Sequence, residues 1–137
     1  MPEPIHMTVR DVMKTSFETI DGSATIADAL TKMRDRKSIV LVVNKRHEQD
    51  EYGLLLVSDI ARKVLAPRRC PARVNVYEIM DKPVVRVHPD MDIAHCARLF
   101  NQFNLIRALV MEDGKLVGTV SPRALVIYGL AKMEGIC

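Results

Sequence analysis

The chain has 137 residues, of which 48% are hydrophobic and 27% charged, and its formal net charge is +3. This size suits one ordinary globular domain, and neither a run of about 18 apolar residues nor a secretory signal at residues 1–6 is present. We therefore expect a cytoplasmic protein with no membrane insertion, and so modest a charge does not by itself indicate nucleic acid as a partner.

The first half of the chain shows a fixed order of expected elements. A β-prone stretch at residues 17–20 follows residues 9–13, and turn residues 21–23 come next. A helix then begins after Ser23 as N-cap, with apolar residues at i, i+3, i+4 and i+7. These expected buried residues are Ile26, Ala29, Leu30 and Met33. Two β-rich runs, at 39–43 and 54–57, flank a charged turn and lead into a helix over 58–65.

The second half repeats this order of elements. Residues 76–80 correspond to 9–13, and a helix after Asp90 or Asp92 carries the same apolar spacing at Ile93, Cys96, Ala97 and Phe100. Two β-rich runs, 108–111 and 116–120, flank a tight turn. The last helix, over 122–133, begins with Pro122, where no amide hydrogen bond is lost. This self-similarity indicates an internal duplication.

The duplication sets the expected domain organisation. We place the first motif with its N-terminal extension at residues 1–67, an arginine-rich linker at 68–75 and the second motif at 76–137. A lone motif of about 60 residues buries little surface, so the two should pack into one compact module. Short strands with helices to one side predict an α+β (mixed α/β) fold in which each short sheet packs against two helices.

The repeat resembles a tandem pair of CBS domains, the cystathionine-β-synthase-type regulatory motif that is also called a Bateman module. The resemblance extends from about Thr8 to Met133. It depends on residues 11–13, their counterparts 78–80, and the run 118–121 that leads into a helix. In this family two motifs related by a pseudo-two-fold axis form clefts that often bind AMP, ATP or S-adenosylmethionine, and many pairs dimerise. The resemblance thus implies a regulatory homodimer that binds an adenosine-type metabolite, including ADP, between its motifs and signals to an unidentified regulated protein.

The family's ligand motif runs Gly, two apolar residues, Ser or Thr, two variable residues, then Asp. Its hydroxyl approaches phosphate and its carboxylate holds the ribose diol, from which a carboxylate can accept two hydrogen bonds. The second copy has the hydroxyl, Ser121, but Ala124 stands in place of the carboxylate. The first copy has Asp59 but Leu56 in place of the hydroxyl. Asp59 also has a structural interpretation, because a carboxylate is favoured in the first turn of a helix.

Basic residues partly offset this deficit. Arg107 interrupts an apolar strand, an expensive place for a charge unless an anion or a hydrogen-bond partner meets it. In the energy-sensing γ subunits that the pattern resembles, basic residues near this position face ligand phosphates; the alternative is that Arg107 snorkels from an edge strand. Arg123, at a helix start, could reach the same phosphate or point to water. The resemblance adds four further candidates for the pocket: Ser38, Ile39, Ser16 and Glu18.

Catalysis and metal binding find no support in the sequence. It has no nucleophile elbow, Walker loop, His-Glu-x-x-His or glycine-rich dinucleotide turn, so we expect no enzymatic activity and no cofactor. Three distant cysteines, odd in number and without a Cys-x-x-Cys pair, predict free thiols and no metal site.

Two alternative functions remain open. A structural or dimerisation module without ligand would follow from the incomplete ligand motif in both copies. A weak nucleic-acid binder would use a basic cluster that lacks aromatic stacking residues, and we regard that cluster mainly as a solvated helix end and linker. The cluster comprises Arg62, Lys63, Arg68, Arg69 and Arg73.

Overall fold

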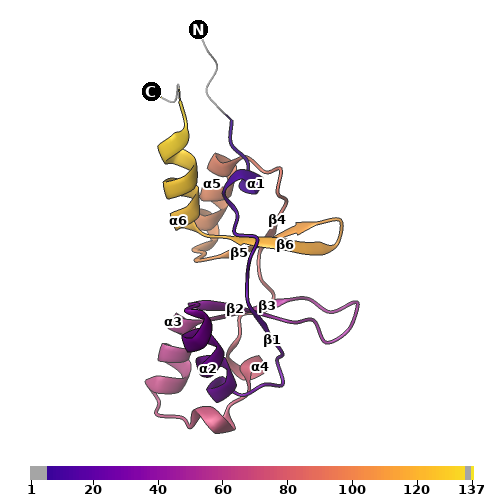
Figure 1. Cartoon of the computed structure of the whole chain (residues 1–137), viewed down its shortest axis with the longest axis vertical. Helices are drawn as coiled ribbons and strands as arrows, with labels where there is room; N and C mark the ends of the chain where they lie inside the picture. Colours follow the sequence, from indigo (N-terminus) through magenta and orange to yellow (C-terminus); the bar gives the residue numbers. More distant parts are fainter. Residues whose placement is uncertain (1–5, 135–136) are drawn as a thin grey trace. The chain divides into compact units, whose positions relative to one another are not determined.

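The computed structural model describes residues 6–134 and 137, so residues 1–5 and 135–136, at the outer ends of the two expected motifs, lie outside the description. The described chain forms short helices and two three-stranded sheets (Figure 1). The expected mixed α+β class is therefore confirmed. Within the described residues, no helix is long and apolar enough to cross a membrane.

The two sheets have the same topology. The first has the order β1 (Thr19–Ile20), β2 (Val40–Val43) and β3 (Gly53–Leu56), and the second β4 (Arg86–Val87), β5 (Ala108–Glu112) and β6 (Lys115–Val120). In each sheet the first strand is parallel to the second, and the second is antiparallel to the third. The pairing of Thr19 with Val42 recurs in the second sheet as Arg86 with Leu109, with the same separation along the chain. The duplication seen in the sequence thus extends to strand register.

The helices follow the repeat as well. In the first half they are α1 (Val9–Val12), α2 (Ile26–Arg36), α3 (Val57–Ile60) and the π-helical turn η1 (Ala61–Leu65). A 3₁₀ turn, η2 (Pro71–Arg73), stands between the halves. The second half has α4 (Val76–Ile79), α5 (Ile93–Phe103), α6 (Pro122–Ala124), the π-helical η3 (Leu125–Gly129) and the 3₁₀ turn η4 (Leu130–Lys132). The expected helices at 58–65 and 122–133 thus exist, as shorter helical pieces in succession.

The chain divides into two compact units that do not coincide with the sequence motifs. Residues 17–84 form one unit, here called the first-sheet unit. The described residues up to Ser16 join those from Val85 onward in the second-sheet unit, so indigo α1 lies with the orange and yellow elements in Figure 1. The amide of Val9 donates to the carbonyl of Met91 at 2.9 Å, and that of Val76 to Ala24 at 2.8 Å. Each short opening helix therefore packs against the sheet that does not directly follow it.

Each unit has its own apolar core beneath its sheet. In the first-sheet unit, α2 buries Ile26, Ala29 and Met33 against strand residues such as Leu41 and Leu55. In the second-sheet unit, α1 contributes Val9 and Val12, and α5 contributes Ile93, Cys96 and Phe100. Leu30 and Ala97, which the spacing predicted to be buried, are exposed because each helix buries a narrower stripe than the pattern suggested.

The helix ends explain where α2 and α5 start and stop. Thr25, rather than the expected Ser23, caps α2: its hydroxyl accepts from the Asp28 amide at 3.1 Å, and Asp28 accepts from the Thr25 amide at 3.0 Å. Asp92 caps α5, as one of the two expected residues. Both helices end at a residue in the left-handed conformation, Lys37 at φ 52° and Asn104 at φ 51°.

A close backbone approach joins the segment after α1 to the second sheet. Lys14 and Thr119 exchange backbone hydrogen bonds of 2.9 and 3.0 Å along the edge of β6. A Cβ on Gly118 would lie only 2.7 Å from the Lys14 carbonyl oxygen. Glycine is therefore required at 118 by the packing of α1 and its following segment, whether or not a ligand approaches this residue.

Candidate ligand-binding residues

Asp59 is a buried carboxylate at the start of α3. The buried run of β3 ends at Leu56, and the turn into α3 carries Asp59 into the core, where the residue is only 3% exposed. Its Oδ1 accepts a hydrogen bond from Arg62 at 3.1 Å. Its Oδ2 is buried and has no hydrogen-bond partner. A buried carboxylate oxygen without a hydrogen-bond donor is costly, so a ligand that donates a hydrogen bond to it would be favoured.

Asp81, which the sequence reasoning missed, lies beside Asp59. Its backbone pairs with Leu54 on the edge of β3 at 2.8 and 3.0 Å, and this brings its carboxyl group to the buried carboxylate. Burial raises the pKa of Asp81, and the neighbouring Asp59 carboxylate raises it further, against the opposing effect of Lys63 and Arg62. The protonated form of Asp81 is therefore favoured beside this buried carboxylate.

Arg107 stands immediately before β5, rather than within an apolar strand as the sequence pattern suggested. The residue is half-buried, and its Nε is buried without a hydrogen-bond partner. Burial lowers the pKa of its guanidinium, because the charged form loses hydration. An anion bound at this position would compensate for the hydration that the guanidinium loses.

Ser121 and Arg123 stand at the start of α6. Ser121 is the N-cap, and its Oγ accepts from the Ala124 amide at 3.3 Å. The cap uses the oxygen as an acceptor and leaves the hydroxyl hydrogen for donation. The side chain of Arg123 is exposed.

Ser38 and Ile39 form the connection from α2 to β2. The Ser38 hydroxyl donates to the Val40 carbonyl at 2.6 Å, and the Ile39 carbonyl accepts from the Val57 amide at 3.1 Å. This second hydrogen bond holds Ile39 beside Val57 at the start of α3, the helix that contains Asp59. The Ile39 side chain is 65% exposed, so the structure presents an apolar surface there.

The two weaker candidates precede β1 on either side of the unit boundary. Ser16 is exposed and belongs to the second-sheet unit. Glu18 is half-buried in the first-sheet unit, where its carbonyl accepts from the Val42 amide at 2.9 Å.

The candidates thus fall into two sets of different chemistry. The first-sheet unit holds both acidic candidates, the second-sheet unit holds both basic ones, and serines occur in both. The first set is Glu18, Ser38, Ile39 and Asp59; the second is Ser16, Arg107, Ser121 and Arg123. The structure therefore places the two buried unpartnered atoms, Asp59 Oδ2 and Arg107 Nε, one in each unit.

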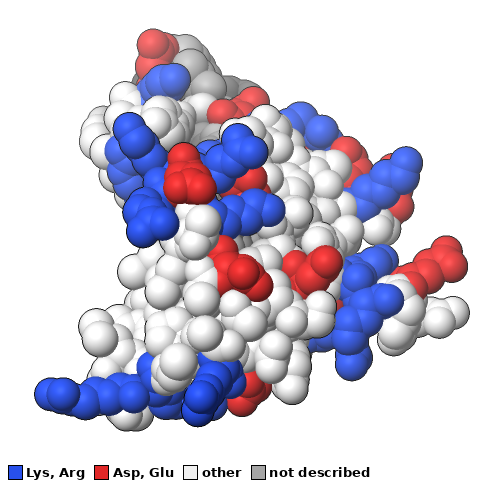
Figure 2. Space-filling model, turned by 60° about the horizontal axis from the view of Figure 1, so that its bottom comes forward, with Lys and Arg blue, Asp and Glu red and all other residues white. Residues whose placement is uncertain are grey.

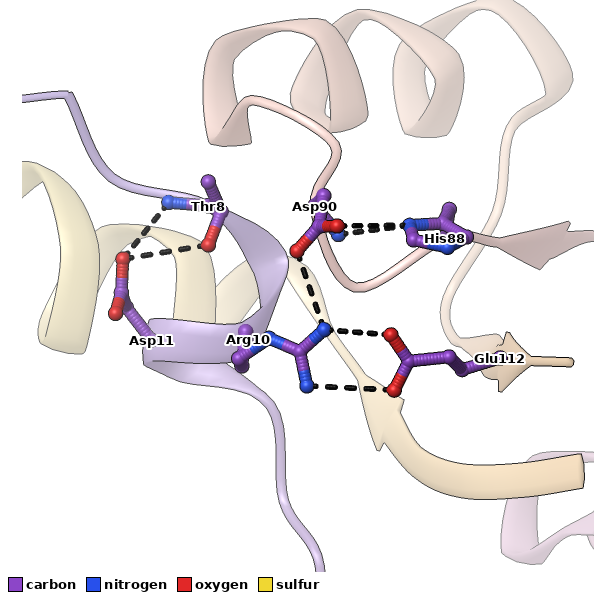
Figure 3. A network of polar contacts seen from close by, with 6 residues as sticks. All are labelled: Thr8, Arg10, Asp11, His88, Asp90 and Glu112. Carbon is purple, nitrogen blue, oxygen red and sulfur yellow. Dashed lines mark hydrogen bonds and ion pairs between the residues drawn. The ribbon is translucent and has the colours of Figure 1, made fainter.

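A polar network that the sequence did not predict fastens α1 within the second-sheet unit (Figure 3). Arg10 donates to Asp90 Oδ1 at 3.1 Å and to Glu112 Oε2 at 2.7 Å. The Arg10 hydrogen bond holds the pKa of Glu112 below its usual value. Ligand atoms of His88, Asp90 and Glu112 lie within 4.8 Å of one another, a spacing that a metal ion could bridge. The Arg10 guanidinium already supplies the positive charge there.

Comparison with known proteins agrees with this architecture. The CBS domain model matches residues 9–66 and again residues 76–130. The chain belongs to the CBS-domain family. Its two matches make it a tandem CBS pair, a kind of module that is generally regulatory rather than catalytic.

Sequence relatives lie in archaea and bacteria. An uncharacterized protein of Methanopyrus kandleri is 27% identical over 84% of this chain, and the CBS domain-containing protein YhcV of Bacillus subtilis is 26% identical over 83%. The chain spans 59% of the length of the M. kandleri protein and 79% of YhcV. An uncharacterized protein of Methanocaldococcus jannaschii is 25% identical, and the chain spans 58% of it.

Solved structures share the fold closely. A hexameric CBS-CP12 protein from bloom-forming cyanobacteria is 39% identical, with a TM-score of 0.85 over 90% of this chain and 71% of that one. A conserved CBS domain protein of Thermoplasma acidophilum is 29% identical, with a TM-score of 0.80 over 90% of this chain and 70% of that one. The tandem CBS architecture is therefore found in proteins of quite different sources.

Proposed function

We propose that this CBS pair is a cytoplasmic sensor that binds an adenosine-containing metabolite and signals its presence to a regulated protein. AMP, ADP, ATP and S-adenosylmethionine are the candidate ligands. One observation supports the proposal above all: each unit buries one polar side-chain atom with no partner, Asp59 Oδ2 and Arg107 Nε. Buried polar atoms are normally satisfied, so two exceptions among the expected ligand residues favour groups awaiting a ligand.

The chemistry of these atoms fits the parts of a nucleotide. Asp59 Oδ2 can accept a hydrogen bond from a ribose hydroxyl. Arg107 Nε and the Ser121 hydroxyl can donate to phosphate oxygens, and a guanidinium is well suited to this. Because Leu56 and Ala124 leave each copy with half of the family motif, we expect weaker binding than a complete motif would give.

Thermal unfolding with each candidate ligand tests the proposal. A ligand at 100 times its dissociation constant should stabilise the protein by about 2.7 kcal/mol. Arg107→Gln should weaken binding of the phosphate-bearing ligands by roughly 10- to 100-fold, the loss expected for a charge-assisted hydrogen bond. Asp59→Asn should weaken adenosine as well as the nucleotides, because it acts on the ribose.

Arg98→Gln is the matched control, because Arg98 is exposed on α5 and carries the same charge. It should leave every affinity unchanged. If none of the four ligands raises the unfolding temperature of the wild-type protein, the sensor proposal is wrong.

A ligand-free dimerisation module is the second candidate. It is favoured by the apolar side chains that η3 and η4 leave exposed: Val126, Ile127, Tyr128 and Leu130, each 46–50% exposed. Surface of this kind is suited to a second copy of the chain. Light scattering after size-exclusion chromatography, from 1 to 100 μM as roughly the range of weak self-association, should show a dimer in either case. A dimer with no ligand-dependent stabilisation would favour the scaffold.

The basic cluster gives nucleic-acid binding little support. Arg62 is bonded to Asp59, and Arg69 to Glu78 at 3.2 Å. On the face drawn in Figure 2, basic side chains are interspersed with acidic ones. A phosphate backbone would have to compete with these internal partners.

A further inference from the structure

A hollow of about 850 Å³ opens within the first-sheet unit, where β2 passes into loop 44–52. Val43 and Met80 supply apolar lining, and Tyr77 of α4 adds a ring that is 59% exposed. Three basic residues, Lys45, Arg46 and Lys82, also line the hollow. The volume is that of a typical small-molecule site.

This hollow is separate from the candidate residues for the adenosine-type ligand. Ser38 and Ile39 precede β2, and Asp59 follows β3, so all three lie at one end of the antiparallel pair. Val43 and the loop after it lie at the opposite end of the four-residue strand β2, about 13 Å along the strand. The two sites therefore share no residue, and their variants can be compared, with Lys82 the one that lies next in the chain to Asp81.

In the second-sheet unit, an arginine of the chain itself occupies the corresponding position. In the repeat, Tyr77 corresponds to Arg10 and Lys45 to Glu112. The backbone is the same in both: the Arg10 amide donates to Pro89 at 2.7 Å, and the Tyr77 amide to Gly22 at 3.0 Å. In the second-sheet unit the Arg10 guanidinium reaches across to Asp90 and Glu112 (Figure 3). A side chain of this chain thus neutralises the acids there.

In the first-sheet unit, the corresponding acidic positions are basic or neutral, and no arginine stands at the position of Arg10. The acid Glu112 is replaced by Lys45, Asp90 by Ser23, and the bridging arginine by Tyr77. The acid on the wall, Asp21, accepts a hydrogen bond from the Asn44 side chain at 2.9 Å. Where one unit satisfies its acids internally, the other presents basic groups to an open hollow.

A carboxylate behind the hollow holds two of these basic groups in place. Asp50 accepts from Arg46 Nε at 3.0 Å and from Lys82 Nζ at 2.7 Å, and its side chain is only 7% exposed. These bonds hold the pKa of Asp50 well below its usual range. Each cation keeps further N–H donors, because Arg46 has five and Lys82 three. Lys45 donates to the Glu48 carbonyl at 3.1 Å and likewise keeps two.

We propose that this hollow binds a small metabolite that carries a carboxylate or phosphate oxyanion on an aromatic ring. The oxyanion takes the free donors of Lys45, Arg46 and Lys82, and the ring packs on Tyr77 and Met80. Loop 44–52, which supplies two of the three cations, is longer than the turn between β5 and β6 and is not required by the repeat. Loops beside a rigid sheet are a common source of binding sites.

Titration of the ¹⁵N-labelled full chain with benzoate, phenyl phosphate and benzamide tests this inference. Benzamide matches benzoate in size but has no charge. Benzoate and phenyl phosphate should shift the amide signals of Gly22, Asn44 and Tyr77, and benzamide at the same concentration should not. Signals near Asp59 and Arg107 should stay in place.

Charge-removing variants complete the test. Arg46→Gln and Lys82→Gln should each weaken benzoate by about tenfold or more. Arg36→Gln, an exposed change at the end of α2, should leave it unchanged. The Lys82 side chain is only 20% exposed, so Lys82→Gln could unfold the protein. The Arg46 side chain is 74% exposed, so Arg46→Gln tests the site even in that case. Equal shifts with benzamide and benzoate, shifts elsewhere in the chain, or full affinity in Arg46→Gln would each overturn the site.

Discussion

Replacing Gly118 by alanine should loosen the segment after α1 from the second sheet. The new Cβ would lie 2.7 Å from the Lys14 carbonyl oxygen, closer than real Cβ contacts allow, so the two backbones must separate. Separation breaks the two hydrogen bonds between Lys14 and Thr119, each worth about 1 kcal/mol net. The expected loss is therefore about 2 kcal/mol, and more if Val9 and Val12 lose core contacts.

Urea unfolding followed by circular dichroism measures this loss. Gly22→Ala is the matched control, because a Cβ there would meet its nearest atoms at 3.5 and 3.6 Å, an ordinary contact distance. The control should change the free energy of unfolding by less than about 0.5 kcal/mol. Equal stability of the two variants would refute the claim that packing of the Lys14 segment fixes residue 118 as glycine.

Three further predictions concern single side chains. Lys37→Gly should stabilise the chain by about 0.5 to 1 kcal/mol in urea unfolding, because Lys37 ends α2 at φ 52°, where glycine is unstrained; an unchanged or lower midpoint would contradict this. The raised pKa of Asp81 means that its folded state favours the protonated form, so its contribution is present below about pH 4 and is lost as pH rises through the folded pKa. Asp81→Asn should therefore gain stability relative to wild type as the pH rises from about 4 to 7, and a pH-independent difference in unfolding free energy would show that the pKa of Asp81 is not raised. Burial raises the pKa of the Cys96 thiol to about 11, so a thiol reagent at neutral pH should modify the two exposed cysteines in the native protein and Cys96 only after unfolding; rapid reaction of all three would show that the α5 core is open.

The sequence predicted the regular elements because their patterns are local. Apolar spacing located α2 and α5, and β-rich runs located the paired strands within one or two residues. The short helices α1 and α4 were not predicted, although Thr8 with Asp11 and Asn75 with Glu78 have the spacing of a capping box. A helix of four residues is too short to show an apolar periodicity, so its capping residues are its only signal in the sequence.

The features that the sequence did not predict depend on contacts between segments that are distant in the chain. The packing of α1 in the second-sheet unit depends on backbone bonds between residues far apart in the chain, such as Arg10 with Pro89. Asp81 reaches Asp59 because its backbone pairs with β3, which no spacing rule encodes. The lack of a partner at Asp59 Oδ2 and Arg107 Nε is a property of the packed environment, since the sequence shows only that the residues are charged. Candidate site residues can be chosen from a sequence motif, but whether their polar atoms have hydrogen-bond partners is known only from the structure.

The duplicated backbone makes the divergence of side chains informative. Where strand register and backbone hydrogen bonds recur in both units, the shared backbone does not by itself dictate the charge of the side chains. Arg10 facing Glu112 in one unit, and Tyr77 beside Lys45 in the other, is such a difference. The same holds for Asp59 against Ala124 and for Arg107 against Val40. Since Arg10 also holds α1 in the second-sheet unit, part of this divergence serves packing, and the remainder gives the two units different chemical groups.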